Sequence, residues 1–284
     1  MPEGDTVWLA AERLRAALAG QMLTRSDFRV PQLATTDVSG RRVEAVVARG
    51  KHLLTRLEGG LTLHTHFRMD GSWRLFRPGQ AWNGGPDWQV RAVLENAQWQ
   101  AVGYRLPVIE LLATADEADA VGHLGPDVLG PDWDPAQAAH RLGQDPAREI
   151  GPALLDQRNL AGIGNVYKTE VLFLRGISPW TATADVDLAA LVTLGARLMQ
   201  ANRGRWEQVT TGDLRPGRGH WVFERQGRPC RRCGTTVRSA EQGDPPYQRL
   251  SYWCPCCQPG PAPAPSAAAP RRRSAPVGRR RYPP

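Results

Sequence analysis

The stretch CRRCGTTVRSAEQGDPPYQRLSYWCPCC, residues 230–257, holds all 5 cysteines of this 284-residue chain. Cys230 and Cys233 form one Cys-x-x-Cys pair, Cys254 and Cys257 form a second, and twenty residues separate the pairs. Four thiolates on two hairpin-like turns at this spacing can occupy the corners of a tetrahedron, which is the geometry of structural zinc. The sequence therefore predicts one structural Zn²⁺, and clustered cysteines without a ligand are the alternative.

The remaining cysteine, Cys256, lies inside the second pair. Because Cys257 preserves the two-residue gap, we interpret Cys256 as a spectator, although an exchange of the two ligands is sterically conceivable. Between the pairs we expect a small β-hairpin that zinc holds together, since its own core is too small to fold unaided. Arg249 is expected near the tip, where an arginine can reach into a duplex; a solvated turn residue is the alternative.

A second informative stretch, ALLDQRNLAGIGNVYKTE, covers residues 153–170. A short apolar helix is predicted to run into the glycine turn Gly162-x-Gly164-Asn165, and another helix to start at Val166. The glycines permit a tight turn, and the exposed amides of the new helix N-terminus suit a DNA phosphate. Asn165 can add a side-chain donor. Taken alone, however, the pattern fits an ordinary helix hairpin with a glycine turn better.

The chain around these stretches divides into segments of different pattern. An amphipathic helix is predicted soon after the start, with Gly20 as its stop, and short β-like runs between Val43 and Leu112 favour a sandwich or barrel. The expected strands include Val43–Val47, His52–Leu57, Leu61–Phe67, Ser72–Phe76 and Arg91–Leu94, and the expected later helices are Pro135–Leu142, Pro152–Gln157, Val166–Leu174 and Asp187–Asn202.

The fold class expected is therefore α+β, with an N-terminal β-sandwich and its leading helix, a helical domain and a zinc-finger β-hairpin. The expected boundaries are 1–121 for the sandwich domain, 122–134 for a linker, 135–219 for the helical domain, 220–258 for the zinc finger and 259–284 for a basic tail.

Composition narrows the class of protein. The net charge is +8, but residues 259–284 carry six arginines and no acid, so the rest of the chain carries only +2. We expect this tail to be disordered and to add non-specific DNA affinity; a tail that binds nothing, or another protein, is the alternative. No apolar stretch approaches the roughly 20 residues of a membrane-spanning helix. The N-terminus lacks the pattern of a secretory signal, so we expect a cytoplasmic protein with reduced thiols.

Four separated stretches, taken together, resemble the formamidopyrimidine-DNA glycosylase and endonuclease VIII family from Pro2 to Gln258. They are the start Pro2-Glu3-Gly4, the turn Arg49-Gly50-Lys51, the stretch Leu154–Phe173, and the cysteine region with Gly227-Arg-Pro-Cys and Tyr252-Trp-Cys. The resemblance implies a helix-two-turn-helix in the helical domain and a zinc finger at the hairpin. It also implies a monomeric base-excision-repair enzyme, a DNA glycosylase with abasic-site lyase activity, that acts on damaged double-stranded DNA.

The resemblance assigns the chemistry to Pro2, Glu3 and Lys51. Removal of Met1 leaves Pro2 with a secondary amine that can attack the sugar C1′ and form an iminium, followed by β- and δ-elimination. Glu3 is expected to help open the sugar ring and transfer protons, and Lys51 to contact phosphate and transfer protons. An N-terminal proline that merely frays is the alternative.

The same resemblance places Asn165 and Arg249 as the pair that grips the phosphates and kinks the duplex. It places Met69 as the wedge that fills the gap left by the everted base, with a buried core methionine as the alternative.

Three departures from the family pattern bear on the substrate. Thr6 stands where many relatives carry a second carboxylate, and Asp5 is close but not in register. The Arg-x-Phe wedge pair of the purine-specific branch is absent from Tyr104-Arg105-Leu106-Pro107, and the segment Thr210–Trp221 leaves little room for that branch's long loop. The last two departures favour the endonuclease VIII branch and oxidised pyrimidines. A catalytically inactive binder of damaged DNA and an oxidised-purine glycosylase are the alternatives.

Overall fold

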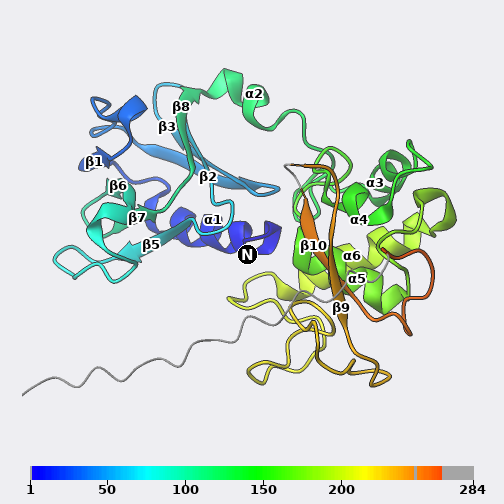
Figure 1. The fold of residues 1–284 in the computed structure, drawn as a ribbon. Coiled ribbons are helices and arrows are strands. Elements are labelled where there is room, and N and C mark those ends of the chain that lie inside the picture. The colour runs from blue at the N-terminus through cyan, green and yellow to red at the C-terminus, as the bar shows by residue number, and fades with distance from the viewer. Residues whose placement is uncertain (1, 246–247, 264–284) are drawn as a thin grey trace, which may run out of the picture.

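The computed structural model describes residues 2–245 and 248–263. It confirms the α+β fold, with a β-sandwich and its leading helix on one side and helices with a small hairpin on the other (Figure 1). The predicted tail from 259 onward falls almost entirely outside the described residues, because only 259–263 are among them.

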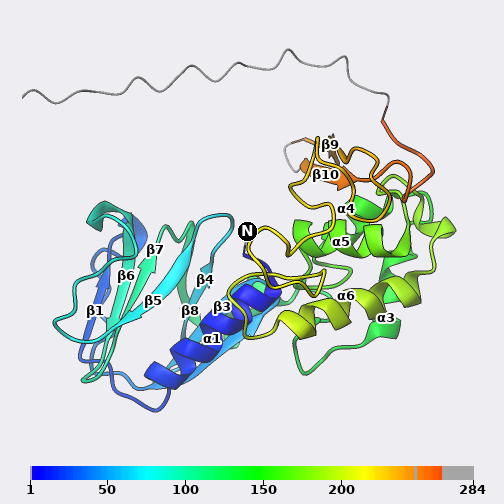
Figure 2. The ribbon, with the colours of Figure 1, turned by 90° about the horizontal axis from the view of Figure 1, so that it is seen from below.

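The leading helix, α1 (Gly4–Leu18), begins with a capping box formed by Glu3 and Thr6. Its apolar face is buried against the sandwich, and Gly20 follows its end with a φ of 76°. Because a positive φ is strained for residues with a Cβ, a glycine is the natural residue there. Figure 2 shows α1 running along the sandwich, with its first turn directed at the helical part of the molecule.

Two four-stranded antiparallel sheets form the sandwich. One contains, in spatial order, β2 (Val43–Arg49), β3 (His52–Leu57), β4 (Leu61–His66) and β8 (Val108–Ala113); the other contains β1 (Arg25–Phe28), β6 (Val90–Glu95), β7 (Gln100–Tyr104) and β5 (Ser72–Phe76). Side chains from both sheets and from α1 share one apolar core, which includes Leu18, Val46, Leu63 and Leu94. Strands β3, β4, β6 and β7 each carry three or more consecutive buried residues, so both of their faces are largely covered.

The second part of the molecule is mainly helical. Its helices are α3 (Pro135–Leu142), α4 (Ile150–Leu155), α5 (Asn165–Arg175) and α6 (Leu188–Asn202). The short helix α2 (Glu117–Val121) belongs to the sandwich side, where Glu117 binds Arg56 of β3 and Thr62 of β4. Among the described residues, short 3₁₀ turns occur at Pro31–Leu33, Asp87–Gln89, Thr114–Asp116 and Thr183–Asp185. A second apolar core, which includes Leu154, Tyr167 and Met199, lies among these helices. None of the helices in the described ranges is long and apolar enough to cross a membrane.

Helix α4 starts two residues before the predicted Pro152 and ends at Leu155, before the predicted Gln157. The earlier start is compatible with Pro152, because the first turn of a helix does not use its own amide hydrogens in intrahelical bonds. The chain leaves the helix at Asp156, whose φ of −72° and ψ of 106° are extended.

A two-stranded antiparallel hairpin, β9 (Arg238–Gln242) and β10 (Arg249–Trp253), completes the fold. Strand β10 packs against α5. The core beneath the hairpin contains Phe173, Val222 and Val237 together with buried cysteines. This small core agrees with the expectation that the hairpin needs a further stabilising element.

Candidate active site

The Glu3 carboxylate lies at the N-terminus of α5. Its Oε2 accepts a hydrogen bond from Gly164 N at 2.8 Å, its Oε1 accepts one from Val166 N at 2.7 Å, and Tyr167 N is 3.4 Å from Oε2. The side chain is completely buried. Free amides and the positive end of a helix dipole stabilise a carboxylate, but burial destabilises its charge. Burial is the larger effect, and it raises the pKa of Glu3 to about 7.

Glycines make this approach possible. A Cβ at Gly164 would lie 2.5 Å from the carboxyl carbon of Glu3, and a Cβ at Gly4 would lie 2.9 Å from Cα of Gly162. The backbone of Gly4 also donates to the carbonyl of Gly162 at 2.9 Å. The glycine turn predicted from the sequence therefore receives the start of the chain, since no larger residue would leave room for Glu3.

Lys51 lies on the other side of the same glycine turn. Its Nζ donates to the carbonyl of Ile163 at 2.6 Å. The preceding residue, Gly50, has a φ of 57°, and its amide donates to the buried carboxylate of Asp127 at 2.7 Å, which fixes the turn between β2 and β3. Burial lowers the pKa of Lys51 to about 8, and the negative charge of Glu3 opposes that shift. Glu3 and Lys51 are thus electrostatically coupled near neutral pH.

Pro2 is half-buried and lines a cavity of about 460 Å³. The other walls of this cavity come from α1 and from the segment between α6 and the hairpin, including Thr6, Gln208, His220 and Phe223. In Figure 1 the chain's first residues lie between the sandwich and the helices, with the hairpin on the helical side. The structure therefore places Pro2 beside Glu3, next to a space large enough for a small ligand.

Asn165 and Arg249 are brought together from distant parts of the chain. Asn165 is the first residue of α5, and its Nδ2 donates to the carbonyl of Leu250 at 2.9 Å. Arg249, which precedes Leu250, begins β10. Burial is the main cause that lowers the pKa of Lys51 and Lys168, and the charge of Arg249 lowers both further. The two side chains predicted to grip phosphate thus lie near Lys51, the buried Lys168 and the first turn of α5.

Met69 lies in the turn between β4 and β5 and is 53% exposed. The alternative of a buried core methionine is therefore wrong for this position. Arg68, which precedes it, has a φ of 46°, in the left-handed region that non-glycine residues rarely adopt. An exposed apolar side chain on a turn of this kind can be inserted into a partner, whereas a core side chain cannot.

Asp5 and Thr6, two neighbouring residues near the chain start, have different surroundings. Asp5 is buried, and it accepts hydrogen bonds from the Tyr167 hydroxyl at 2.7 Å and from Nε2 of Gln208 at 2.9 Å. Burial raises the pKa of Asp5 above its usual range. Thr6, at the position of the usual second carboxylate, lines the cavity beside Pro2 instead. Asp5 therefore does not replace the missing carboxylate in the cavity wall, because its side chain is held against α5.

Sequence reasoning did not identify Lys168 and Glu170, two buried charged residues of α5. Nζ of Lys168 donates to Oγ of Ser251 at 2.7 Å, and burial lowers the pKa of this lysine to about 7. The Glu170 carboxylate accepts backbone amides of Trp221, Val222 and Phe223 at 2.7, 2.9 and 2.9 Å. The only signal in the sequence was the presence of charged residues inside an otherwise apolar helix. Their hydrogen-bond partners, Ser251 and residues 221–223, lie about 50 to 80 positions away along the chain, so the sequence did not reveal them.

The four paired cysteines form one cluster. Sγ of Cys230 is 4.0 Å from Sγ of Cys257, Sγ of Cys233 is 3.4 Å from Sγ of Cys254, and all four sulfurs lie within 4.8 Å of one another. A tetrahedral ion with Zn–S bonds of about 2.3 Å requires sulfur separations of roughly 3.8 Å. These residues therefore fit a metal ion. Cys256 is exposed and is not part of the cluster.

Comparison with known families gives the class of this protein. Residues 1–105 match the formamidopyrimidine-DNA glycosylase N-terminal domain, and residues 124–201 match the formamidopyrimidine-DNA glycosylase H2TH domain. The chain belongs to the formamidopyrimidine-DNA glycosylase family, as the resemblance in the sequence indicated.

Three relatives in this family are similar to the chain over almost its whole length. The chain is 60% identical to the probable endonuclease 8 2 of Streptomyces coelicolor, over 96% of this chain and 100% of that protein. It is 46% identical to DNA-(apurinic or apyrimidinic site) lyase Nei2 of Mycolicibacterium smegmatis, over 91% and 99%. It is 33% identical to endonuclease 8 of Escherichia coli, over 91% and 100%.

A solved structure shares the fold at lower identity. The complex between Lactococcus lactis Fpg and an abasic site containing DNA superposes with a TM-score of 0.76 at 22% identity, over 91% of this chain and 100% of that one. At this identity the likeness supports the arrangement of sandwich, helices and hairpin.

Proposed function

We propose that the protein is a bifunctional DNA glycosylase and abasic-site lyase of base excision repair, with damaged double-stranded DNA as its substrate and Pro2 as its nucleophile. The observation that carries this proposal is the position of Glu3. Its buried carboxylate lies at a helix N-terminus, coupled to Lys51, and the neighbouring Pro2 lines a cavity. Relatives named endonuclease 8 and abasic-site lyase support the same reaction class.

The first step uses the secondary amine that Pro2 carries once Met1 is removed. Its lone pair attacks the sugar C1′, the bond from C1′ to the damaged base breaks, and the electron pair leaves with the base, which takes up a proton. The amine proton is then lost, and the nitrogen lone pair opens the sugar ring to give an iminium.

Glu3 is suited to supply the proton that the ring oxygen needs when the ring opens. With a pKa of about 7, a substantial fraction of this side chain is protonated at neutral pH. An ordinary glutamate, with a pKa near 4.5, would be almost fully ionised there and could not act as an acid.

The elimination steps follow from the iminium. It acidifies C2′, so loss of a proton there expels the 3′ phosphate, and a second elimination expels the 5′ phosphate. Water then hydrolyses the iminium and restores the amine of Pro2. Lys51, with a pKa of about 8, can contact the departing phosphate as a cation or transfer a proton.

DNA is proposed to bind across Asn165, Arg249 and Met69. The first two lie beside the first turn of α5, and Met69 is exposed on its turn. The amides of Gly164 and Val166 in that turn already bind Glu3, so the proposed phosphate contacts come from the side chains. One zinc ion held by Cys230, Cys233, Cys254 and Cys257 would stabilise the hairpin that carries Arg249, and it has no role in the chemistry.

Oxidised pyrimidines are the proposed substrates within this class. The endonuclease 8 names of the relatives and the short Thr210–Trp221 segment support this preference. An oxidised-purine glycosylase is the second candidate. An inactive binder of damaged DNA has less support, since a binder needs neither a coupled Glu3–Lys51 pair nor a proline amine.

Borohydride trapping on a duplex with one abasic site tests the proposal. Borohydride reduces an iminium to a stable amine, so we expect a covalent complex whose adduct mass spectrometry locates on the Pro2 nitrogen. Pro2→Gly, which replaces the secondary amine with a primary one, should trap more slowly. An adduct on Lys51, or no adduct with a fully folded protein, would contradict the assignment.

A further inference from the structure

Trp206 lies in the loop after α6 and is 71% exposed. Exposed apolar side chains are common on protein surfaces, so exposure alone indicates nothing. Trp88, in a 3₁₀ turn of the sandwich, is 72% exposed as well, yet it lines neither of the two cavities described next. The distinguishing feature of Trp206 is its position.

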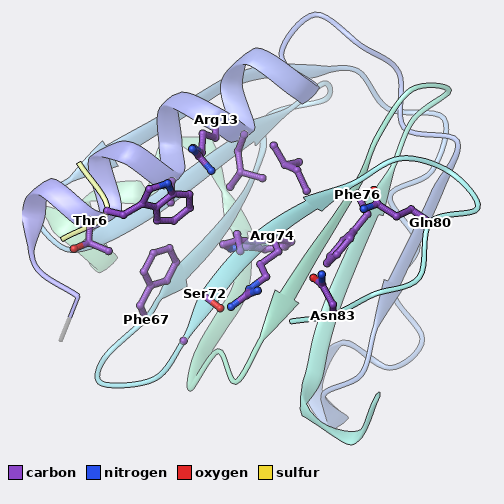
Figure 3. A pocket seen from close by; sticks show the side chains of 14 residues that line it. Thr6, Arg13, Phe67, Ser72, Arg74, Phe76, Gln80 and Asn83 are labelled. Atoms are coloured by element: carbon purple, nitrogen blue, oxygen red, sulfur yellow. The ribbon is translucent and has the colours of Figure 1, made fainter. Parts of the chain in front are cut away.

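Trp206 and Thr6 line two cavities. The first, of about 500 Å³, runs between α1 and β5, with Thr6 and Phe67 at one end and Asn83 at the other (Figure 3). The second, of about 460 Å³, contains Pro2. Trp206 is therefore part of the wall that both cavities share.

Arg13 occupies one side of the Trp206 ring. Its guanidinium carbon is 3.9 Å from the ring centroid, and it lines the first cavity and not the second. Trp206 thus has Arg13 on the side of the first cavity, and it also borders the cavity that contains Pro2. A cation over one face holds the indole in place and leaves its remaining surface available for stacking.

The loop is anchored on both sides of Trp206. Asn202, at the end of α6, binds both the amide and the carbonyl of Val209, at 2.7 and 3.0 Å. Gln208 donates to Asp5 at 2.9 Å, and the guanidinium of Arg203 lies 4.6 Å from the Trp8 ring centroid. The exposed indole is therefore preorganised, which lowers the entropy cost of binding a ligand against it.

A base bonded to C1′ must lie next to Pro2 when the amine attacks that carbon. The second cavity is the space there, and its volume falls within the roughly 300–1,000 Å³ of small-ligand sites. We propose that Trp206 stacks on the everted damaged base in this cavity and is a specificity-determining residue of the base-excision step. This inference rests on the proposed glycosylase function and adds a residue to it.

The cavity also offers a polar group for the edge of a base. Within the described residues, Nε2 of His220 is buried in its wall and has no hydrogen-bond partner. A nucleobase presents donors and acceptors along its edge and a π-face above it, so aromatic and polar wall groups together match its chemistry.

The test compares two single-turnover rates in the full-length zinc-loaded protein. One is base excision from a duplex with one oxidised pyrimidine, and the other is strand cleavage of the same duplex with a preformed abasic site, which has no base to stack. For Trp206→Ala we expect the ratio of the first rate to the second to fall about tenfold or more, the order expected for loss of one base–aromatic stack.

Matched variants separate stacking from bulk. Trp206→Phe keeps an aromatic face and should preserve most of the ratio, whereas Trp206→Leu keeps only apolar volume and should lower it as alanine does. Trp88→Ala, the control of equal exposure, should leave the ratio unchanged. An unchanged ratio in Trp206→Leu would overturn the stacking role, and so would an equal fall in both rates, which indicates a structural role. If the unmodified protein neither cleaves the abasic duplex nor traps with borohydride, the proposed function itself fails.

Discussion

Oε1 of Glu3 lies 2.7 Å from the backbone nitrogen of Val166, and this hydrogen bond joins the start of the chain to the first turn of α5. The side chain of Glu3 thereby binds the N-terminus of α5 in the helical part, while Glu3 itself is the N-cap residue of α1 on the sandwich. The proposed nucleophile, Pro2, is positioned relative to the helical part of the molecule because its neighbour is held in this way.

The pKa of Glu3 predicts a pH-dependent stability. The folded-state pKa of about 7 is above the ordinary value of 4.5, so the folded protein holds this proton more tightly than the unfolded chain. This proton adds up to about 3 kcal/mol to the free energy of unfolding. The added stability is fully present below pH 4.5 and is lost as the pH rises through 7. Chemical denaturation at pH 5 and pH 8 should show a smaller decline for Glu3→Gln than for the unmodified protein. An equal decline would contradict the assigned pKa.

Glu3→Gln should also slow the chemistry. An amide cannot supply the ring-opening proton, and its NH₂ group faces an amide donor at Gly164 or Val166. We expect strand cleavage of an abasic duplex to fall at least about 100-fold, the usual contribution of a general acid. The pH–rate profile is the specific measurement, because the limb that declines above about pH 7 should disappear. A variant that retains the profile would show that another group titrates.

Gly164→Ala should displace the Glu3 side chain. The new Cβ would lie 2.5 Å from the carboxyl carbon, although the backbone φ of −126° is one that alanine adopts without strain. The loss therefore comes from overpacking, about 1–3 kcal/mol of unfolding free energy, together with lost cleavage activity. Gly143→Ala is the matched control, since its Cβ would meet its nearest neighbour at 3.4 Å. Equal melting temperatures for both variants would refute the steric explanation.

Arg249→Ala should weaken binding to undamaged duplex and reduce its salt dependence. Loss of one phosphate contact lowers the slope of log affinity against log salt by about 0.9. Fluorescence anisotropy across a salt series measures this slope. Arg25→Ala, on β1 of the sandwich, should change the slope little, and a similar change in both variants would indicate a general charge effect instead of a contact.

Serine substitutions should identify the metal ligands. Replacement of Cys230, Cys233, Cys254 or Cys257 should release zinc, because each sulfur belongs to the four-sulfur cluster, whereas Cys256→Ser should retain it. Metal content by mass spectrometry of the purified variants is the measurement. Zinc retained in Cys257→Ser and lost in Cys256→Ser would reverse the proposed ligand choice.

Much of the fold could be predicted because it is encoded locally. The predicted helix Pro135–Leu142 matches α3, with Asp134 accepting the amides of Ala136 and Gln137 as its N-cap. The short run Ser72–Phe76, predicted to be a strand, forms β5, with Trp73 and Phe76 buried. The boundaries of α4 were less accurate because Pro152 is compatible with more than one position in a first turn.

The sequence by itself determined the elements, the spacing of the cysteine pairs and, through its resemblance to a family, the identities of Pro2, Glu3 and Lys51. Only the tertiary structure decided what those residues touch. That Asp5 is bound by Tyr167 while Thr6 lines the cavity, and that Trp206 borders the space beside Pro2, depends on contacts between segments that are about 160 to 200 residues apart. Local pattern encodes periodicity and caps; burial, pKa and cavity walls arise only when distant segments pack together and exclude water.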